Sequence, residues 1–134
     1  APERYAVYLN QSGIGLPDRD YYLKPDFAEQ RQAYTAYTAK LLSLIGWAEP
    51  EATAAKVIAF ETKVAEDGWD KAKLRDPTIQ YNPHSPAELA TLAPGFDWNA
   101  FLDGAKLGGR DRFIVGQPDA FTRLAAHCRN RLCR

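Results

Sequence analysis

The stretch of sequence that decides the fold is PEATAAKVIAFETKVAED, residues 50–67. It opens on proline, which is favoured in the first turn of a helix because its missing N–H group is not needed there. Apolar side chains then recur at the spacing of one helical face, at Val57, Ile58, Phe60, Val64 and Ala65. Gly68 follows and can end a helix, so we predict a helix from Pro50 to about Asp67.

Glu61 falls in the middle of this apolar face, where a carboxylate without a partner would be costly. Two interpretations follow. A catalytic glutamate would lie against apolar walls that perturb its ionisation, whereas a structural one would be neutralised by a cation. We favour the second, and we expect Glu61 to pair with Arg19, Arg31 or Arg75 and to hold two segments together.

A second long helix is predicted on the N-terminal side, between Pro25 and Gly46, with Asp26 as its cap. Its apolar face comprises Phe27, Tyr34, Tyr37, Leu41, Leu44 and Ile45. Before it, residues 4–11 alternate in the manner of a strand, and a turn with two glycines and Pro17 follows.

On the C-terminal side, residues 69–83 are polar and rich in turn residues. Ser85-Pro86-Ala87-Glu88 is a capping box that opens a short helix to Leu92, and Asp97 caps another short helix. Residues 113–115 are predicted to form a second strand and Pro118 to open a final helix. The fold class is therefore mainly α: two long helices, several short ones and one small two-stranded ribbon, in which the two strands pair.

The composition limits the class of protein. The chain has 134 residues, 46% of them hydrophobic, and seventeen basic side chains balance seventeen acidic ones. These values are typical of one globular domain, so we expect a single helical unit over residues 1–134. A net charge of zero argues against nucleic acid as a partner. No apolar run approaches the ~20 residues that cross a bilayer, so we expect no membrane contact.

Few residues could support catalysis. The two histidines, His84 and His127, begin no HExxH zinc motif. His127 with Cys128 and Cys133 could supply three metal ligands, but a terminal helix end is the better interpretation; whether the cysteines form a disulfide stays open.

Other candidate sites are equally weak. Ser12 lies in no GxSxG motif, and the Gly13-Ile14-Gly15 segment lacks the third glycine of a dinucleotide loop. Asp18 and Asp20 could form an acid–base pair or bind a cation, yet a turn and a helix cap explain them more simply. We therefore assign no catalytic, cofactor-binding or metal-binding residue and expect no cofactor in this chain.

With these segments identified, the chain resembles the neprilysin and endothelin-converting enzyme family of zinc metallopeptidases, in its bacterial form. The resemblance rests first on QSGIGLPDRDYYL, residues 11–23. Further matches follow in the family's order along nearly the whole chain: Arg31-Gln-Ala-Tyr34, Leu41-Leu42, Ala59-Phe60-Glu61, Arg75-Asp76-Pro77, Tyr81-Asn82-Pro83, Ala93-Pro-Gly-Phe-Asp-Trp98 and Ile114-Val-Gly-Gln-Pro118.

The resemblance implies a role without catalysis. The family carries zinc in a C-terminal catalytic domain, and the segment matched here belongs to the preceding helical region, which restricts the chamber to peptide-sized substrates. The expected partners are therefore that catalytic domain and, in the parent protein, a peptide. The parent is expected in the periplasm or outside the cell, and the chain should be inactive alone. Residues from about 125 on do not look like the family, and both ends of the chain are expected to be artificial.

The alternative is a stand-alone helical module that binds a protein or peptide. Its groove would be lined by Tyr34, Tyr37, Trp69 and Trp98, although packing in a core explains such aromatic side chains more simply.

Overall fold

The computed structural model describes residues 5–127 of the chain. These residues form two compact units: the first draws on Ala1–Gln11 and Lys71–Arg134, and the second is Ser12–Asp70. Helices dominate both, as the sequence predicts, and a small sheet completes the first unit. The short helix α4, Lys71–Leu74, also belongs to the first unit.

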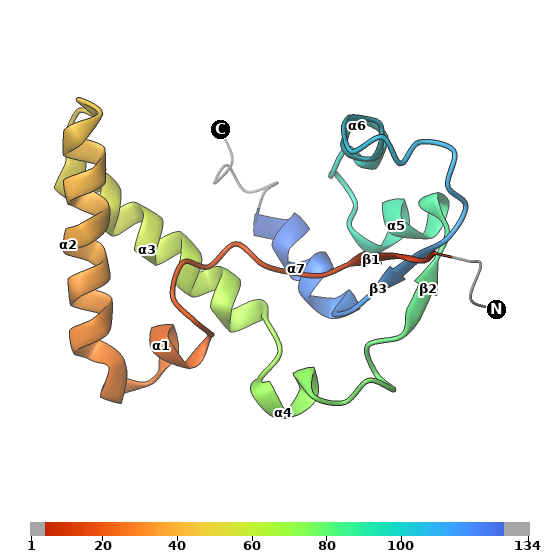
Figure 1. The fold of residues 1–134 in the computed structure, drawn as a ribbon, viewed down its shortest axis with the longest axis horizontal. Coiled ribbons are helices and arrows are strands. Elements are labelled where there is room, and N and C mark those ends of the chain that lie inside the picture. Colours follow the sequence, from red (N-terminus) through yellow and green to blue (C-terminus); the bar gives the residue numbers. More distant parts are fainter. Residues whose placement is uncertain (1–4, 128–134) are drawn as a thin grey trace. The chain divides into compact units, whose positions relative to one another are not determined.

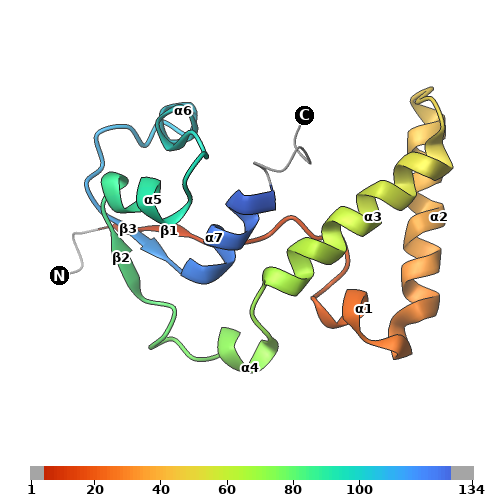
Figure 2. The ribbon, with the colours of Figure 1, turned by 180° about the vertical axis from the view of Figure 1, so that it is seen from behind.

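The second unit is a helical hairpin with a short helix beside it (Figures 1 and 2). It contains α1 (Asp20–Leu23), a 3-10 turn (Pro25–Phe27), α2 (Ala28–Leu44) and α3 (Pro50–Asp67). The bounds of α3 confirm the prediction from its sequence.

The turn between α2 and α3 depends on Gly46, whose φ of 72° lies in the left-handed region. There the amide of Gly46 donates to the carbonyl of Ser43, and the amide of Trp47 donates to the carbonyl of Leu42. This pairing satisfies the last carbonyls of α2, as in a Schellman motif.

Two features of α2 differ from expectation. Asp26 lies within the 3-10 turn, and Phe27 occupies the N-cap without a side-chain hydrogen bond, so the predicted cap is wrong. The 3-10 turn Pro25–Phe27 leads directly into α2, so Asp26 lies inside a helical turn and is not the residue that caps α2. In addition, most of the apolar face of α2 is exposed in the described residues: Tyr37, Leu41, Leu44 and Ile45 all face solvent.

The first unit contains a three-stranded sheet with the order β1-β3-β2. β1 (Val7–Leu9) runs parallel to β3 (Phe113–Val115), which confirms the predicted pairing of these segments. β2 (Asn82–His84) pairs antiparallel with the other side of β3 and enlarges the expected ribbon to three strands. Pro83 hides this strand in the sequence, and an edge position tolerates it because one side of an edge strand needs no donor.

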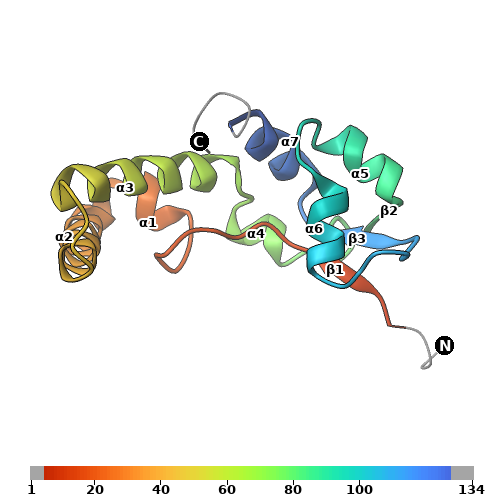
Figure 3. The same ribbon diagram turned by 90° about the horizontal axis from the view of Figure 1, so that it is seen from above.

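The helices of the first unit are α5 (Pro86–Leu92), α6 (Trp98–Gly104) and α7 (Pro118–His127). Figure 3 shows α5 and α7 side by side, next to the strands. The predicted caps are confirmed: the Ser85–Glu88 capping box is complete, and Asp97 accepts from the amide of Ala100 at 3.0 Å.

The core of the first unit forms around β3, whose three residues are all buried. Side chains from α5, α6 and α7 pack against it, and the cluster comprises Leu89, Ala93, Trp98, Leu102, Phe113, Val115 and Ala125. Burial of this apolar area is the main stabilising contribution to the unit.

Candidate functional site

Glu61 joins three other segments of the second unit through hydrogen bonds. Its Oε2 accepts from the hydroxyl of Tyr22 at 2.5 Å and from the amide of Gly15 at 3.2 Å. Its Oε1 accepts from the hydroxyl of Tyr34 at 3.1 Å. Because these donors come from the loop before α1, from α1 and from α2, one carboxylate on α3 holds the helices and the loop together.

Tyr22 extends the network to the loop. Its side chain is only 4% exposed, and its hydroxyl accepts from the amides of Gly15 at 3.0 Å and Leu16 at 2.9 Å. Burial first, and then the hydrogen bond to Glu61, raise the pKa of Tyr22 well above its usual value. The hydroxyl therefore stays protonated and donates a hydrogen bond to the carboxylate.

Gly15 is required by close packing. A Cβ atom at this position would overlap the hydroxyl of Tyr34. Any larger residue would therefore push Tyr34 away from Glu61, which explains why this position in the GLPDRDYY stretch takes glycine. We name Gly15, Leu16, Tyr22, Tyr34 and Glu61 the Glu61 cluster.

Two of the predicted arginine partners of Glu61, Arg19 and Arg31, are wrong. Arg19 donates to the carbonyl of Gly68 at 3.0 Å, and Arg31 donates to the carbonyls of Tyr21 and Lys24, each at 2.7 Å. Arg75 belongs to the other unit. Neutral hydroxyl and amide donors take the place of the cations: three of them occupy three of the about four acceptor positions of this half-buried carboxylate.

The Glu61 cluster is suited to positioning. A general base has to face a substrate, whereas both oxygens of Glu61 accept hydrogen bonds from within the unit. The prediction that Glu61 holds separate segments together agrees with this geometry, although its partners differ.

Asp18 and Asp20 form local structure. The carboxylate of Asp18 accepts a hydrogen bond from the amide of Asp20 at 2.8 Å. Asp20 forms an ion pair at 2.8 Å with Lys24, four residues further along the chain. These contacts stabilise the turn into α1.

The remaining candidate ligands do not assemble in the described part of the chain. His84 lies on β2 with its Nδ1 2.9 Å from the carbonyl of Asn82, and His127 is the last residue of α7. Cys128 and Cys133 lie outside the described residues. Within residues 5–127, no group of three or more His, Cys, Asp or Glu side chains could hold a metal ion.

The four aromatic residues predicted to line a groove have different environments. Tyr34 belongs to the Glu61 cluster and Tyr37 is exposed on α2. Trp69 is partly buried, and Trp98 is packed in the core of the first unit.

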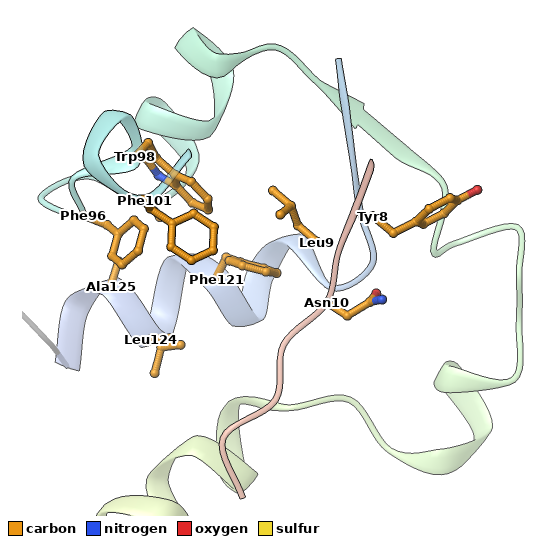
Figure 4. A pocket seen from close by; sticks show the side chains of 10 residues that line it. Tyr8, Leu9, Asn10, Phe96, Trp98, Phe101, Phe121, Leu124 and Ala125 are labelled. Atoms are coloured by element: carbon orange, nitrogen blue, oxygen red, sulfur yellow. The ribbon is translucent and has the colours of Figure 1, made fainter. Parts of the chain in front are cut away.

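The first unit contains a pocket that the sequence did not predict (Figure 4). Its volume is about 360 Å³, and it is lined by Tyr8, Leu9, Asn10, Ala93, Phe96, Trp98, Phe101, Phe121, Leu124 and Ala125. These residues come from three separate stretches of the chain, 8–10, 93–101 and 121–125. Their only signal in the sequence is the dense run of aromatic residues between positions 96 and 101.

The aromatic side chains around the pocket pack edge to face. The rings of Phe96 and Trp98 lie 4.8 Å apart, those of Phe96 and Phe101 5.6 Å apart, and those of Trp98 and Phe101 6.0 Å apart. Such contacts fix the orientation of the rings, so the wall of the pocket is formed before any molecule enters it.

Comparison with known proteins identifies relatives along the whole described chain. The model of peptidase family M13 matches residues 1–131, past residue 124, where the resemblance read from the sequence stopped. Endothelin-converting enzyme 1 is 37% identical over 101 residues in Homo sapiens and 36% identical over 104 residues in Cavia porcellus. These matches cover 72% and 75% of the chain but only 13% and 14% of the relatives.

Solved structures agree. The chain is similar to the zinc metalloprotease Zmp1 of Mycobacterium tuberculosis, both in its open state and in complex with an inhibitor. Each comparison gives a TM-score of 0.83 at 36% identity and covers 92% of the chain and 20% of Zmp1. The chain thus spans about one fifth of its solved relatives. None of the described helices is long and apolar enough to cross a membrane.

Proposed function

The chain belongs to peptidase family M13, and from this premise we propose that it is a non-catalytic segment of a zinc-dependent metalloendopeptidase. In that parent it forms part of the wall of the chamber that admits peptide substrates. The observation that carries the proposal is the match of one fifth of Zmp1 to nearly the whole chain, at a TM-score of 0.83.

Zinc does not fit the described residues of this chain. They contain no suitable group of ligands, and the full sequence has two histidines and no HExxH motif. We therefore assign no step of hydrolysis to this chain. The zinc belongs, in our proposal, to the catalytic domain of the same parent polypeptide, where it would polarise the scissile carbonyl and activate water.

Exposed apolar surface supports a role in contact with another part of the parent. One side of α2 exposes four apolar side chains to solvent: Tyr37, Leu41, Leu44 and Ile45. The exposed Trp47 lies in the turn that follows. Folded monomers rarely expose contiguous apolar patches of this kind unless a partner covers them. We propose that the partner is the catalytic domain, that the chamber holds a peptide, and that the parent acts in the periplasm or outside the cell.

The first experiment tests the chain alone. Purified protein is incubated with a fluorogenic peptide, with and without added zinc, and hydrolysis is followed over time. We expect no zinc-dependent turnover above a zinc-only control. Turnover that requires both zinc and this chain would contradict the proposal.

The second experiment tests the role in the chamber. A hybrid Zmp1 carries this chain in place of the segment that it matches, and a truncated Zmp1 lacks the segment corresponding to the tip of the α2–α3 hairpin. We expect the hybrid to retain zinc-dependent hydrolysis of a short peptide. The truncated protein should hydrolyse a long unfolded polypeptide faster, relative to the short peptide, than Zmp1 does. An unchanged ratio would argue against a chamber wall.

A further inference from the structure

The pocket of the first unit combines a formed wall with apolar surface that remains in water. Phe96 and Phe101 line it, and their side chains are 43% and 46% exposed. Trp98, which packs against both rings, is almost fully buried. Burying these two large aromatic side chains would stabilise the protein further, and that stabilisation is missing while they stay in water.

The lining determines the chemistry of the occupant. None of the side chains that line the pocket is charged. A charged group would lose its hydration there without gaining a partner, which is strongly unfavourable. Aliphatic and aromatic groups, by contrast, gain from contact with Leu9, Phe121 and Leu124 (Figure 4). The volume of about 360 Å³ is small for a ligand site and suits a few apolar side chains.

The length of the relatives indicates where such side chains come from. The chain covers 20% of Zmp1 and 13% to 14% of the endothelin-converting enzymes. About four fifths of the solved relative therefore lies outside the part that this chain matches, which leaves ample polypeptide to supply such a segment. An apolar segment of that remaining polypeptide is present at a high effective concentration because it is covalently linked. A small molecule or a second copy has no such advantage.

We propose that this pocket is a docking site for apolar side chains of the parent metallopeptidase from a segment outside these 134 residues. The inference rests on the proposed function, because it requires that the chain be part of a longer polypeptide. It adds the location of one contact and the chemistry of the segment that makes it.

The experiment places a photoreactive amino acid, p-benzoylphenylalanine, at position 101 of the hybrid Zmp1. Position 79 receives the same group as a matched control, since Ile79 is exposed to a similar degree in the same unit but does not line the pocket. After irradiation, mass spectrometry identifies the cross-linked peptides. We expect position 101 to give an intramolecular cross-link to an apolar segment outside the inserted chain, at a yield several-fold above that of position 79.

Other outcomes would overturn the proposal. A cross-link from position 101 to a second copy would make the pocket a contact between molecules. A yield no higher than that of position 79 would leave the pocket open to solvent. If the hybrid does not fold, the same group at the Zmp1 position that superposes on Phe101 gives the same readout.

A substitution provides a second measurement. Phe101→Asp puts a carboxylate at the edge of the pocket, and Ile79→Asp is its control. In the 134-residue chain, Phe101→Asp also loses the ring contacts with Phe96 and Trp98, so the difference in melting temperature between the two variants serves as the baseline. In the hybrid this difference should grow by several degrees, and Phe101→Leu should reduce it. An equal difference in the chain and in the hybrid would refute docking at this site.

The two proposals can fail separately. Cross-linking and melting temperature report on docking whether or not the segment restricts the chamber. If the hybrid gives the cross-link but the truncated Zmp1 keeps an unchanged ratio of long to short substrates, the proposed function alone is contradicted. If the truncated Zmp1 gives the expected ratio but the hybrid gives no cross-link, this inference alone is contradicted.

Discussion

Replacing Tyr22 by phenylalanine should destabilise the second unit because this change removes the hydroxyl at the centre of the Glu61 cluster. The hydroxyl donates to Glu61 at 2.5 Å and accepts from the amide of Leu16 at 2.9 Å. The ring itself is preserved, so the apolar contacts of a side chain that is 4% exposed stay in place. The effect of the substitution is therefore confined to polar contacts.

The expected magnitude follows from these contacts. A hydrogen bond to a charged group contributes about 1.5–3 kcal/mol, and a partly buried amide that loses its acceptor costs about 1 kcal/mol more. The amide of Gly15 loses less, because it also donates to Glu61. We expect Tyr22→Phe to lower the free energy of unfolding by about 2.5–4 kcal/mol.

Tyr21→Phe is the matched control. Tyr21 is the neighbouring residue, its ring stacks on Phe27 at 4.2 Å, and within the described residues its hydroxyl makes no hydrogen bond. Urea unfolding followed by circular dichroism gives the free energy of unfolding, and amide hydrogen exchange of Val64 and Ala65 localises the change to α3. If Tyr22→Phe costs no more than Tyr21→Phe, the Glu61 cluster does not hold the unit together.

Three further predictions concern pH, a cap and the core. Burial first, and then the charge of Glu61, raise the pKa of Tyr34. Its contribution to the free energy of unfolding is therefore fully present below about pH 10 and should be lost as the pH rises further. A urea midpoint that does not change between pH 9 and about 11 would contradict this. Ser85→Ala removes the side-chain acceptor of the capping box and should cost about 1 kcal/mol, whereas Ser85→Asp should retain most of that stability in the same urea assay. Leu89→Ala should cost about 2–5 kcal/mol because Leu89 is fully buried, while Leu44→Ala should change stability by less than about 0.5 kcal/mol because Leu44 is 70% exposed; similar costs for the two would mean that these burial assignments are wrong.

Local signals in the sequence were sufficient for most helices. Pro50 and Gly68 bound α3 because proline and glycine act through their own backbone geometry, without help from distant residues. The Ser85–Glu88 capping box is equally local, since both hydrogen bonds join residues three positions apart. Asp26 shows the limit of such signals: its position predicted an N-cap, but the residue lies inside a 3-10 turn.

Contacts between distant residues were harder to predict. The position of Glu61 on its helix predicted that it would join separate segments, but charge alone suggested arginine partners. Tyr22 and Tyr34 lie 39 and 27 positions away, and nothing local marks their hydroxyls as donors to this carboxylate. β2 was missed for a related reason, because it pairs with β3, 31 positions along the chain from Pro83 to Ile114.

The sequence by itself determined the two long helices, the caps at Ser85 and Asp97, the mainly helical class and membership of peptidase family M13, because these depend on short patterns that each residue carries with it. Only the tertiary structure decided which donors reach Glu61, why Gly15 has no room for a side chain, and where three separate stretches form one pocket. Those features depend on the relative placement of residues far apart in the chain, and that placement is fixed by the packing of the helices and strands as a whole.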